Sequence, residues 1–182
     1  CDAIIAMGYE AGGHRGMFLS DDLSSQVGTF ALVPQVVDAV KVPVIAAGAI
    51  SDARGVAAAL MLGASAVQVG TAFLFTPEAK VSASHHKALR TAKESQTAIT
   101  NIFTGRPARG IVNRAMRELG PMSAQAPAFP LAGGALMPLR AKDDADFANL
   151  WAGQALTLGK DIGSAELTRQ LAEGALAKLN RH

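Results

Sequence analysis

The sequence predicts an α/β fold with a parallel sheet, and two observations carry this prediction. Three short segments rich in Ile, Val and Ala, at residues 3–7, 43–47 and 66–69, have the composition of strands buried on both faces. Segments with helical spacing of apolar residues separate these strands. Regular alternation of strand and helix is typical of a parallel sheet, which is either open and doubly wound or closed into a barrel.

The two connecting helices follow from apolar residues at three- and four-residue spacing. Ser51 or Asp52 is expected to cap the second helix, because a short polar side chain there accepts a hydrogen bond from a free backbone amide. The first pattern consists of Leu32, Val33, Val36, Val37 and Val40, and the second of Val56, Ala57, Leu60 and Met61.

No further strand is predicted after Phe75, and the rest of the chain is expected to be helical apart from one long loop. Several prolines and a glycine pair predict that this irregular loop covers residues 122–138. Helices are predicted at 77–93, opened by Pro77, and at 109–119, 144–158 and 165–179, the last with Ser164 as its N-cap.

Composition excludes several classes of protein. The chain has 182 residues, of which 49% are apolar and 18% charged, as is ordinary for a globular protein. Its apolar stretches are shorter than the roughly 20 residues that span a bilayer, so no membrane association is expected. A single cysteine excludes an internal disulfide framework and favours a reducing, cytoplasmic location. Because the chain begins with Cys1 inside a strand pattern, we expect it to be part of a longer protein.

Positive charge is concentrated in residues 77–142, which carry ten basic and three acidic side chains. Binding of nucleic acid would favour aromatic side chains that stack on bases, and only Phe103 and Phe129 lie in this part of the chain. We therefore expect no nucleic-acid partner. A solvated helical face, or attraction for small anionic substrates, explains the charge better.

Two glycines at consecutive strand ends indicate a phosphate site. Gly48 and Gly70 each follow a predicted strand and leave backbone amides there, while Ser51 and Thr71 add hydroxyl groups. Such glycines also have a purely structural explanation, because a tight turn needs positive φ or close packing. In a barrel, the loops after the last two strands often bind phosphate, and we favour that interpretation.

His14 is the strongest candidate for a catalytic residue. It belongs to a glycine-rich segment, residues 8–16, at the carboxyl end of the first predicted strand, where barrels and doubly wound sheets place their ligands. Imidazole has an ordinary pKa of about 6.5, which suits a base at neutral pH, although a histidine here would also cap a turn. Glu10 stays unassigned, since acid–base chemistry, a salt bridge with Arg15 and capping of a backbone amide are equally open to it.

Other reactive side chains are weaker candidates. His85 and His86 are neighbours on a predicted helix and point about 100° apart, so no metal site is expected. Arg106 and Arg109 lie on a glycine-flanked turn, where they either hold a carboxylate or phosphate or fix the tail to the rest of the fold. Cys1 has no recognisable His or Asn partner, which argues against a nucleophilic role.

Three segments together resemble the signature of the nitronate monooxygenases, formerly called 2-nitropropane dioxygenases. They are residues 8–16 (GYEAGGHRG), 43–50 (PVIAAGAI) and 67–74 (VQVGTAFL), and their order and spacing match as well. Residues 105–114 and 151–154 resemble the tail motifs of the same family. The resemblance therefore runs through nearly the whole chain.

The resemblance implies the carboxyl-terminal part, about strands six to eight, of a TIM (β/α)8 barrel that binds FMN. Residues 1–76 would be the barrel part, 77–142 a helical substrate-side insertion with the irregular loop, and 143–182 helices packing back on the barrel. His14 would be the catalytic base. Two positions depart from the family, in which many members have Gln at Met7 and Gly at Ala49. The residues implied in cofactor binding are Gly12, Gly13, Gly48, Ala49, Gln68, Val69, Gly70 and Thr71.

The activity implied by the resemblance is FMN-dependent oxidation of alkyl nitronates by dioxygen to a carbonyl compound and nitrite. His14 would remove the α-proton of a nitroalkane or receive a preformed nitronate, and positive φ at Gly12 and Gly13 would bring the backbone close to the flavin. An NAD(P)H-dependent FMN reductase for quinones or enoyl thioesters, and a non-catalytic flavin- or phosphate-binding half-barrel, are the alternatives. Three strands cannot close a barrel, so an amino-terminal half is required as a partner. Exposed apolar helices in the tail would suit a homodimer.

Overall fold

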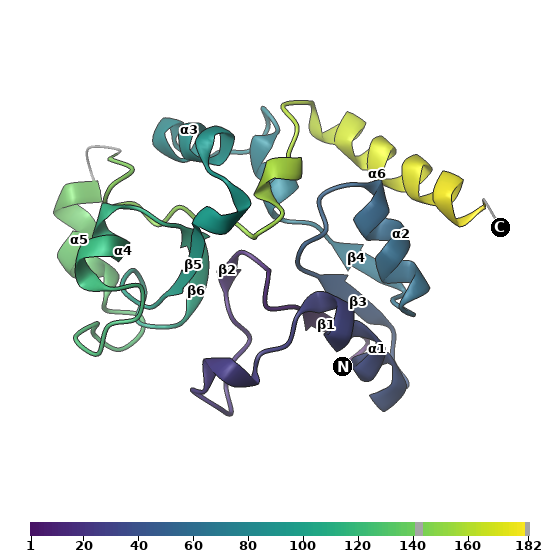
Figure 1. The fold of residues 1–182 in the computed structure, drawn as a ribbon, viewed down its shortest axis with the longest axis horizontal. Helices are drawn as coiled ribbons and strands as arrows, with labels where there is room; N and C mark the ends of the chain where they lie inside the picture. The colour runs from purple at the N-terminus through teal and green to yellow at the C-terminus, as the bar shows by residue number, and fades with distance from the viewer. Residues whose placement is uncertain (141–143, 181–182) are drawn as a thin grey trace.

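The computed structural model describes residues 1–140 and 144–180 and contains the predicted parallel sheet. Strands β1 (Ile4–Met7), β3 (Val44–Ala47) and β4 (Ala66–Gln68) pair in the order β1-β3-β4, with β3 in the centre (Figure 1). All three predicted strands are therefore confirmed to within one residue at each end. Because the strands are parallel, their carboxyl ends meet at one edge of the sheet.

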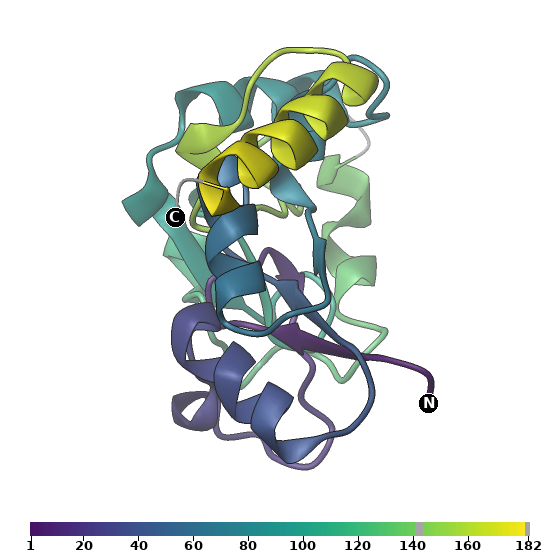
Figure 2. The ribbon, with the colours of Figure 1, turned by 90° about the vertical axis from the view of Figure 1, so that its right-hand side faces the viewer.

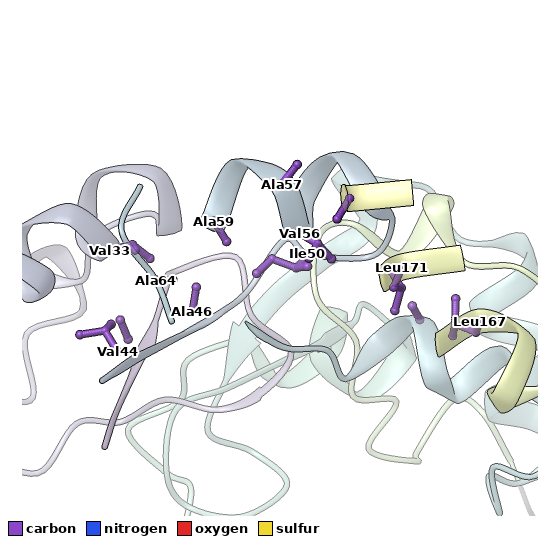
Figure 3. Close-up of a cluster of buried hydrophobic side chains, with 13 residues drawn as sticks. Val33, Val44, Ala46, Ile50, Val56, Ala57, Ala59, Ala64, Leu167 and Leu171 are labelled. Atoms are coloured by element: carbon purple, nitrogen blue, oxygen red, sulfur yellow. The ribbon is translucent and has the colours of Figure 1, made fainter. Parts of the chain in front are cut away.

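Two helices pack on this sheet, and a third packs on one of these helices and completes the core. They are α1 (Thr29–Ala39), α2 (Ala53–Met61) and α6 (Ser164–Leu179), and α6 lies against α2 (Figure 1, Figure 2). The side chains that interlock between sheet and helices are almost all small or β-branched, which allows the helices to approach closely (Figure 3). The core includes Val33, Val44, Ala46, Val56, Ala59, Leu167, Leu171 and Ala175.

Two capping predictions have different outcomes. Asp52 is the N-cap of α2, because its carboxylate accepts hydrogen bonds from the amides of Arg54 and Gly55. Ser164 was expected to cap α6, but it is the first helical residue, and Gly163 is the N-cap. The amide of Ser164 is satisfied instead by the carboxylate of Glu78.

The prediction that no strand follows Phe75 is wrong. Strands β5 (Thr97–Thr100) and β6 (Ala108–Ile111) form a second sheet, antiparallel, in the order β2-β6-β5 with β2 (Gly13–His14). All of β6 is buried, and its sequence, ARGI, lacks the alternation of apolar and polar residues that marks a strand. It takes up the extended conformation because its backbone pairs on both sides.

The remaining helices are shorter than predicted. α3 (Ala83–Thr91) begins after Ser82 rather than at Pro77, and α4 (Arg114–Leu119) begins after Asn113 rather than at residue 109. α5 (Gly133–Arg140) was not predicted; it begins in the last part of the predicted irregular loop and extends beyond its end at residue 138. Short 3-10 helices occupy Leu23–Ser25, Thr71–Phe75, Glu94–Gln96 and Leu156–Leu158.

The helix predicted at 144–158 does not form, because the backbone of this segment is used by its neighbours. The side-chain amide of Asn113 donates hydrogen bonds to the carbonyl oxygens of Ala145 and Ala148, and the amide of Ile111 donates to Leu150. A bridge to β6 follows at Trp151. The predicted boundary between the helical insertion (77–142) and the carboxyl-terminal helices (143–182) lies outside the described residues.

None of the helices in residues 1–140 and 144–180 is long and apolar enough to cross a membrane.

Candidate functional site

A cavity of about 210 Å³ lies at the carboxyl ends of β1, β3 and β4. It brings together most of the residues predicted to bind a cofactor, which come from three separate loops. Val69 is the exception, because its side chain packs against the hydrophobic core instead of lining the cavity. The predicted residues that line it are Gly12, Gly13, Gly48, Ala49, Gln68, Gly70 and Thr71, and Met7 and Ser51 lie beside them.

The tail crosses the glycine-rich loop and forms one wall of the cavity. The amide of Gly153 donates a hydrogen bond of 2.9 Å to Oγ1 of Thr71, and the amide of Gln154 donates one of 3.0 Å to the carbonyl oxygen of Glu10. A Cβ on Gly12 would lie only 2.5 Å from the amide nitrogen of Gly153. Of the two glycines expected to have positive φ, only Gly13 does, at 74°; Gly12 is required by the close approach of the tail.

Ala49 occupies a backbone conformation that favours glycine, with φ of 55°. An Ala residue in the left-handed region costs roughly 1–2 kcal/mol, whereas Gly at the same site costs about 0.4–1 kcal/mol more in chain entropy on folding. Replacing Ala49 with Gly is therefore expected to raise the free energy of unfolding of the complete protein by about 0.5 kcal/mol. Urea unfolding would measure this change.

Ala58 provides the matched control for this substitution. It is exposed within α2, where Ala is favoured over Gly, so Ala58→Gly is expected to destabilise the protein by about 1 kcal/mol. The same chemical change should thus have opposite signs at the two positions. A loss of stability in Ala49→Gly would contradict the assignment of strain to Ala49.

His14 lies at the rim of the site, on the short strand β2. Its neighbour Gly13 lines the cavity, and so does Trp151, whose ring centroid is 5.8 Å from that of His14. Phe129 packs edge-on against the imidazole at 6.0 Å, and Nε2 is 2.9 Å from Oγ1 of Thr104. The imidazole is exposed rather than enclosed in the hydrophobic core, so it is accessible to a ligand.

Glu10 has a structural role, which argues against a role for it in acid–base chemistry. Its carboxylate accepts hydrogen bonds of 2.8 Å from the amide of Thr29 and 2.9 Å from the hydroxyl of the same residue. It therefore caps the amino terminus of α1, where a negative charge is favourable. Of the roles left open for Glu10, capping of a backbone amide is the one that the structure contains.

Arg106 and Arg109, the two arginines of the predicted glycine-flanked turn, lie in different environments. Arg109 is buried, and its guanidinium donates hydrogen bonds to the carbonyl oxygen of Tyr9 and to Oγ1 of Thr97. Burial lowers its pKa, but a guanidinium remains charged at neutral pH. It therefore fixes the second sheet to the glycine-rich loop. Arg106 is exposed, with its guanidinium carbon 5.2 Å from the ring centroid of Phe129.

Arg15 holds the base of the glycine-rich loop from the other side. Its buried guanidinium donates hydrogen bonds to the carbonyl oxygens of Gly8 and Ala11 and to the side-chain oxygen of Gln26. Burial, followed by the positive charge of Arg109, lowers the pKa of Arg15. The two residues on either side of His14, Gly13 and Arg15, are thus both held in place.

The side chain of His85 contacts the backbone of Trp151. Its Nε2 lies 3.1 Å from the carbonyl oxygen of Trp151, and burial lowers the pKa of the imidazole, which favours the neutral form. Within residues 1–140 and 144–180, no group of three or more His, Cys, Asp or Glu side chains is placed to hold a metal ion.

Trp151, Thr104 and Phe129 were not assigned to the site from the sequence. They lie between 90 and 137 residues from His14 along the chain, in segments with no metal-binding or catalytic spacing. The nearest signals in the sequence were the tail motif that contains Trp151 and the glycine-flanked turn that begins at Thr104. Their contribution depends on the second sheet, which brings these segments to His14.

Comparison with known proteins identifies relatives over nearly the full chain. A family model described as nitronate monooxygenase matches residues 1–174. A probable nitronate monooxygenase from Staphylococcus saprophyticus is 39% identical, over 99% of this chain and 52% of that protein. The chain therefore spans about half the length of the curated relatives that it matches.

Two solved structures have the same fold. A nitroalkane oxidase from Streptomyces ansochromogenes is similar with a TM-score of 0.88 and 40% identity, over 98% of this chain and 52% of that one. FabK from Thermotoga maritima is similar with a TM-score of 0.80 and 31% identity, over 99% of this chain and 56% of that one. The fold is the carboxyl-terminal portion of a TIM barrel with a mostly helical tail, as predicted.

Proposed function

The chain belongs to the nitronate monooxygenase family, and on this basis we propose that it forms the carboxyl-terminal half of an enzyme that oxidises alkyl nitronates. The proposed reaction uses bound FMN and dioxygen and yields a carbonyl compound and nitrite, with His14 as the base for neutral nitroalkanes. The observation that carries the proposal is the meeting of three strand-end loops around one cavity, with an accessible imidazole at its rim.

The residues around the cavity fit a flavin phosphate. A Cβ at Gly70 would meet no atom within 4 Å, so the backbone there faces open space. The 3-10 turn that begins at Thr71 has no side-chain cap, which leaves its first amides available to an anion. The hydroxyl of Thr71 accepts from Gly153 and keeps its own hydrogen for a phosphate oxygen.

Other groups would hold the rest of the cofactor. We assign Gly48 and Ala49 to the phosphate together with Gly70 and Thr71, and Gly12, Gly13 and Gln68 to contacts along the flavin. Met7 stands where many family members have Gln, so its contact with the flavin would be apolar instead of polar. Ligand sites usually measure about 300–1,000 Å³, and we assign the remaining wall to the amino-terminal half of the complete protein.

The reaction begins with a proton transfer to His14. The Cα–H bond of the nitroalkane breaks, its electron pair moves into the nitro group to give the nitronate, and the imidazole takes the proton. A substrate that enters as a nitronate does not need this step. Flavin held by the three strand-end loops would supply the electron acceptor for the nitronate and the site of reaction with dioxygen. Arg106 is an exposed cation near the site that favours approach of an anion.

The small molecules proposed as partners are therefore a nitroalkane or nitronate and dioxygen. We also propose that the protein is cytoplasmic and that it forms a homodimer. The exposed free thiol of Cys1 suits a reducing compartment, and exposed apolar side chains of the tail, such as Leu158 and Leu176, suit a subunit contact.

The absorption spectrum of the purified complete protein tests the cofactor, and anaerobic reduction tests the reaction. We expect flavin bands at about one equivalent per chain, and bleaching of those bands by an alkyl nitronate without NADH or NADPH. Rapid bleaching by NADH or NADPH with no response to nitronate would favour the reductase alternative, which the similarity to FabK keeps open. A protein that contains no flavin would favour the non-catalytic half-barrel.

A further inference from the structure

The hydroxyl group of Thr104 has three polar neighbours, one of which is His14. Its Oγ1 is 2.9 Å from Nε2 of His14, 3.2 Å from the carbonyl oxygen of Arg106 and 3.4 Å from the amide nitrogen of Arg106. The contact with His14 is the shortest of the three, and the two contacts with Arg106 are long hydrogen bonds. The roles of the two Arg106 groups are fixed by their chemistry, and they restrict the role of His14.

A count of hydrogens decides which group donates to which. A carbonyl oxygen only accepts and an amide N–H only donates, whereas a hydroxyl donates once and accepts twice. The single hydrogen of Thr104 is within reach of the carbonyl of Arg106 and of Nε2 of His14, while one lone pair faces the amide of Arg106. Because the carbonyl can only accept whereas Nε2 can also donate, all three contacts are hydrogen bonds together only when the hydroxyl donates to Arg106. What remains for His14 is the second lone pair, so the bond at 2.9 Å is complete only if Nε2 carries a hydrogen.

The turn that carries Thr104 is held firmly against the segment of Phe129. The amide of Gly105 donates a 2.7 Å hydrogen bond to the carbonyl oxygen of Asn101, and φ of Gly105 is +88°. A Cβ on Gly105 would overlap the backbone of residues 127–129. The same packing places Phe129 edge-on to the imidazole at 6.0 Å, and the ring of Trp151 contacts it at 5.8 Å, so two aromatic rings help to orient the imidazole toward Thr104.

We propose that Thr104 is a positioning residue that keeps neutral His14 in the Nε2–H form, so that Nδ1 is the nitrogen that takes the substrate proton. The inference rests on the proposed function, in which His14 is the base. As the Cα–H bond of the nitroalkane breaks, its electron pair moves into the nitro group and a new N–H bond forms at Nδ1. The imidazolium that results still donates from Nε2 to Thr104, which stabilises the charged form.

The tautomer can be measured directly in the complete enzyme with ¹⁵N-labelled histidine. At a pH where His14 is neutral, we expect a pyrrole-type signal from Nε2, which carries the hydrogen, and a pyridine-type signal from Nδ1, which does not. The two signals are assigned to His14 because they are lost in His14→Asn. In Thr104→Val these signals should move toward a mixture of the two tautomers. This measurement does not depend on turnover.

Kinetics then test whether the tautomer matters to the proton transfer. Thr104→Val is expected to lower kcat/KM for a neutral nitroalkane by about 10-fold to 100-fold, as for loss of a hydrogen bond to a charged group, and to change the rate with preformed nitronate little. Thr104→Ser should restore the rate with the neutral nitroalkane, and Thr168→Val, which removes a hydroxyl on α6 far along the chain, should leave both rates unchanged.

The inference would be overturned if parent His14 carries its hydrogen on Nδ1, or if Thr104→Val leaves both the tautomer signals and kcat/KM for the neutral nitroalkane unchanged. Should Thr104→Val fail to fold, the signals of the parent and of Thr104→Ser still decide the question. Failure of the proposed function has a different signature, which is that His14→Asn affects neutral nitroalkane and nitronate equally.

Discussion

Replacement of His14 with Asn in the complete enzyme is expected to lower kcat/KM for neutral nitroalkanes by about 10²- to 10⁴-fold, the usual contribution of a general base. Turnover of preformed alkyl nitronates should fall much less, because these substrates have already lost the proton. Asn keeps a polar side chain of similar size on β2 but cannot take up a proton at neutral pH. Parallel assays with a nitroalkane and its nitronate at one pH would measure the difference.

His86→Asn is the matched control for this prediction. His86 lies on α3 at 4.0 Å from the carboxylate of Asp161, away from the cavity, so the same substitution there should leave both activities unchanged. Equal losses on both substrates in His14→Asn would refute the assignment of His14 as the base and indicate a general disturbance of the site.

The parallel sheet could be predicted from the sequence because its signal is local. Val44 and Ala46 lie in a short run of buried apolar residues, and the spacing of Val33 and its neighbours marks one face of a helix. Asp52 gives a start signal of the same local kind. Each of these features involves residues within a few positions of one another, so the local order of residues in the sequence reveals them.

The second sheet could not be predicted because its stability comes from distant partners. β6 has weak strand propensity, yet it pairs with β2, which lies almost one hundred residues earlier in the chain. Arg109 can be buried within a strand because the carbonyl oxygen of Tyr9, a distant residue in the sequence, accepts its hydrogen bond. The contacts of His14 with Thr104 and Phe129 depend on that pairing, and for this reason the glycine segments were predictable while the surroundings of His14 were not.

Arg109 should therefore be among the most sensitive positions of the chain. Arg109→Met keeps most of the apolar stem but removes the hydrogen bonds to Tyr9 and Thr97 and the contact with the Tyr9 ring, whose centroid is 4.9 Å from the guanidinium carbon. We expect the free energy of unfolding of the complete protein to fall by about 3 kcal/mol, since hydrogen bonds from charged donors contribute about 1.5–3 kcal/mol and the carbonyl oxygen of Tyr9 loses its partner. Urea unfolding would measure the loss.

Arg106→Met separates this effect from a general need for positive charge in the turn. Arg106 is exposed and lies over the rings of Phe18 and Phe129, so its replacement is expected to change the free energy of unfolding by less than about 0.5 kcal/mol. Because β2 pairs with β6 at Arg109, Arg109→Met should also loosen His14 and reduce turnover of nitroalkanes. Equal destabilisation by the two substitutions would mean that charge, and not the link from Arg109 to the glycine-rich loop, holds the second sheet in place.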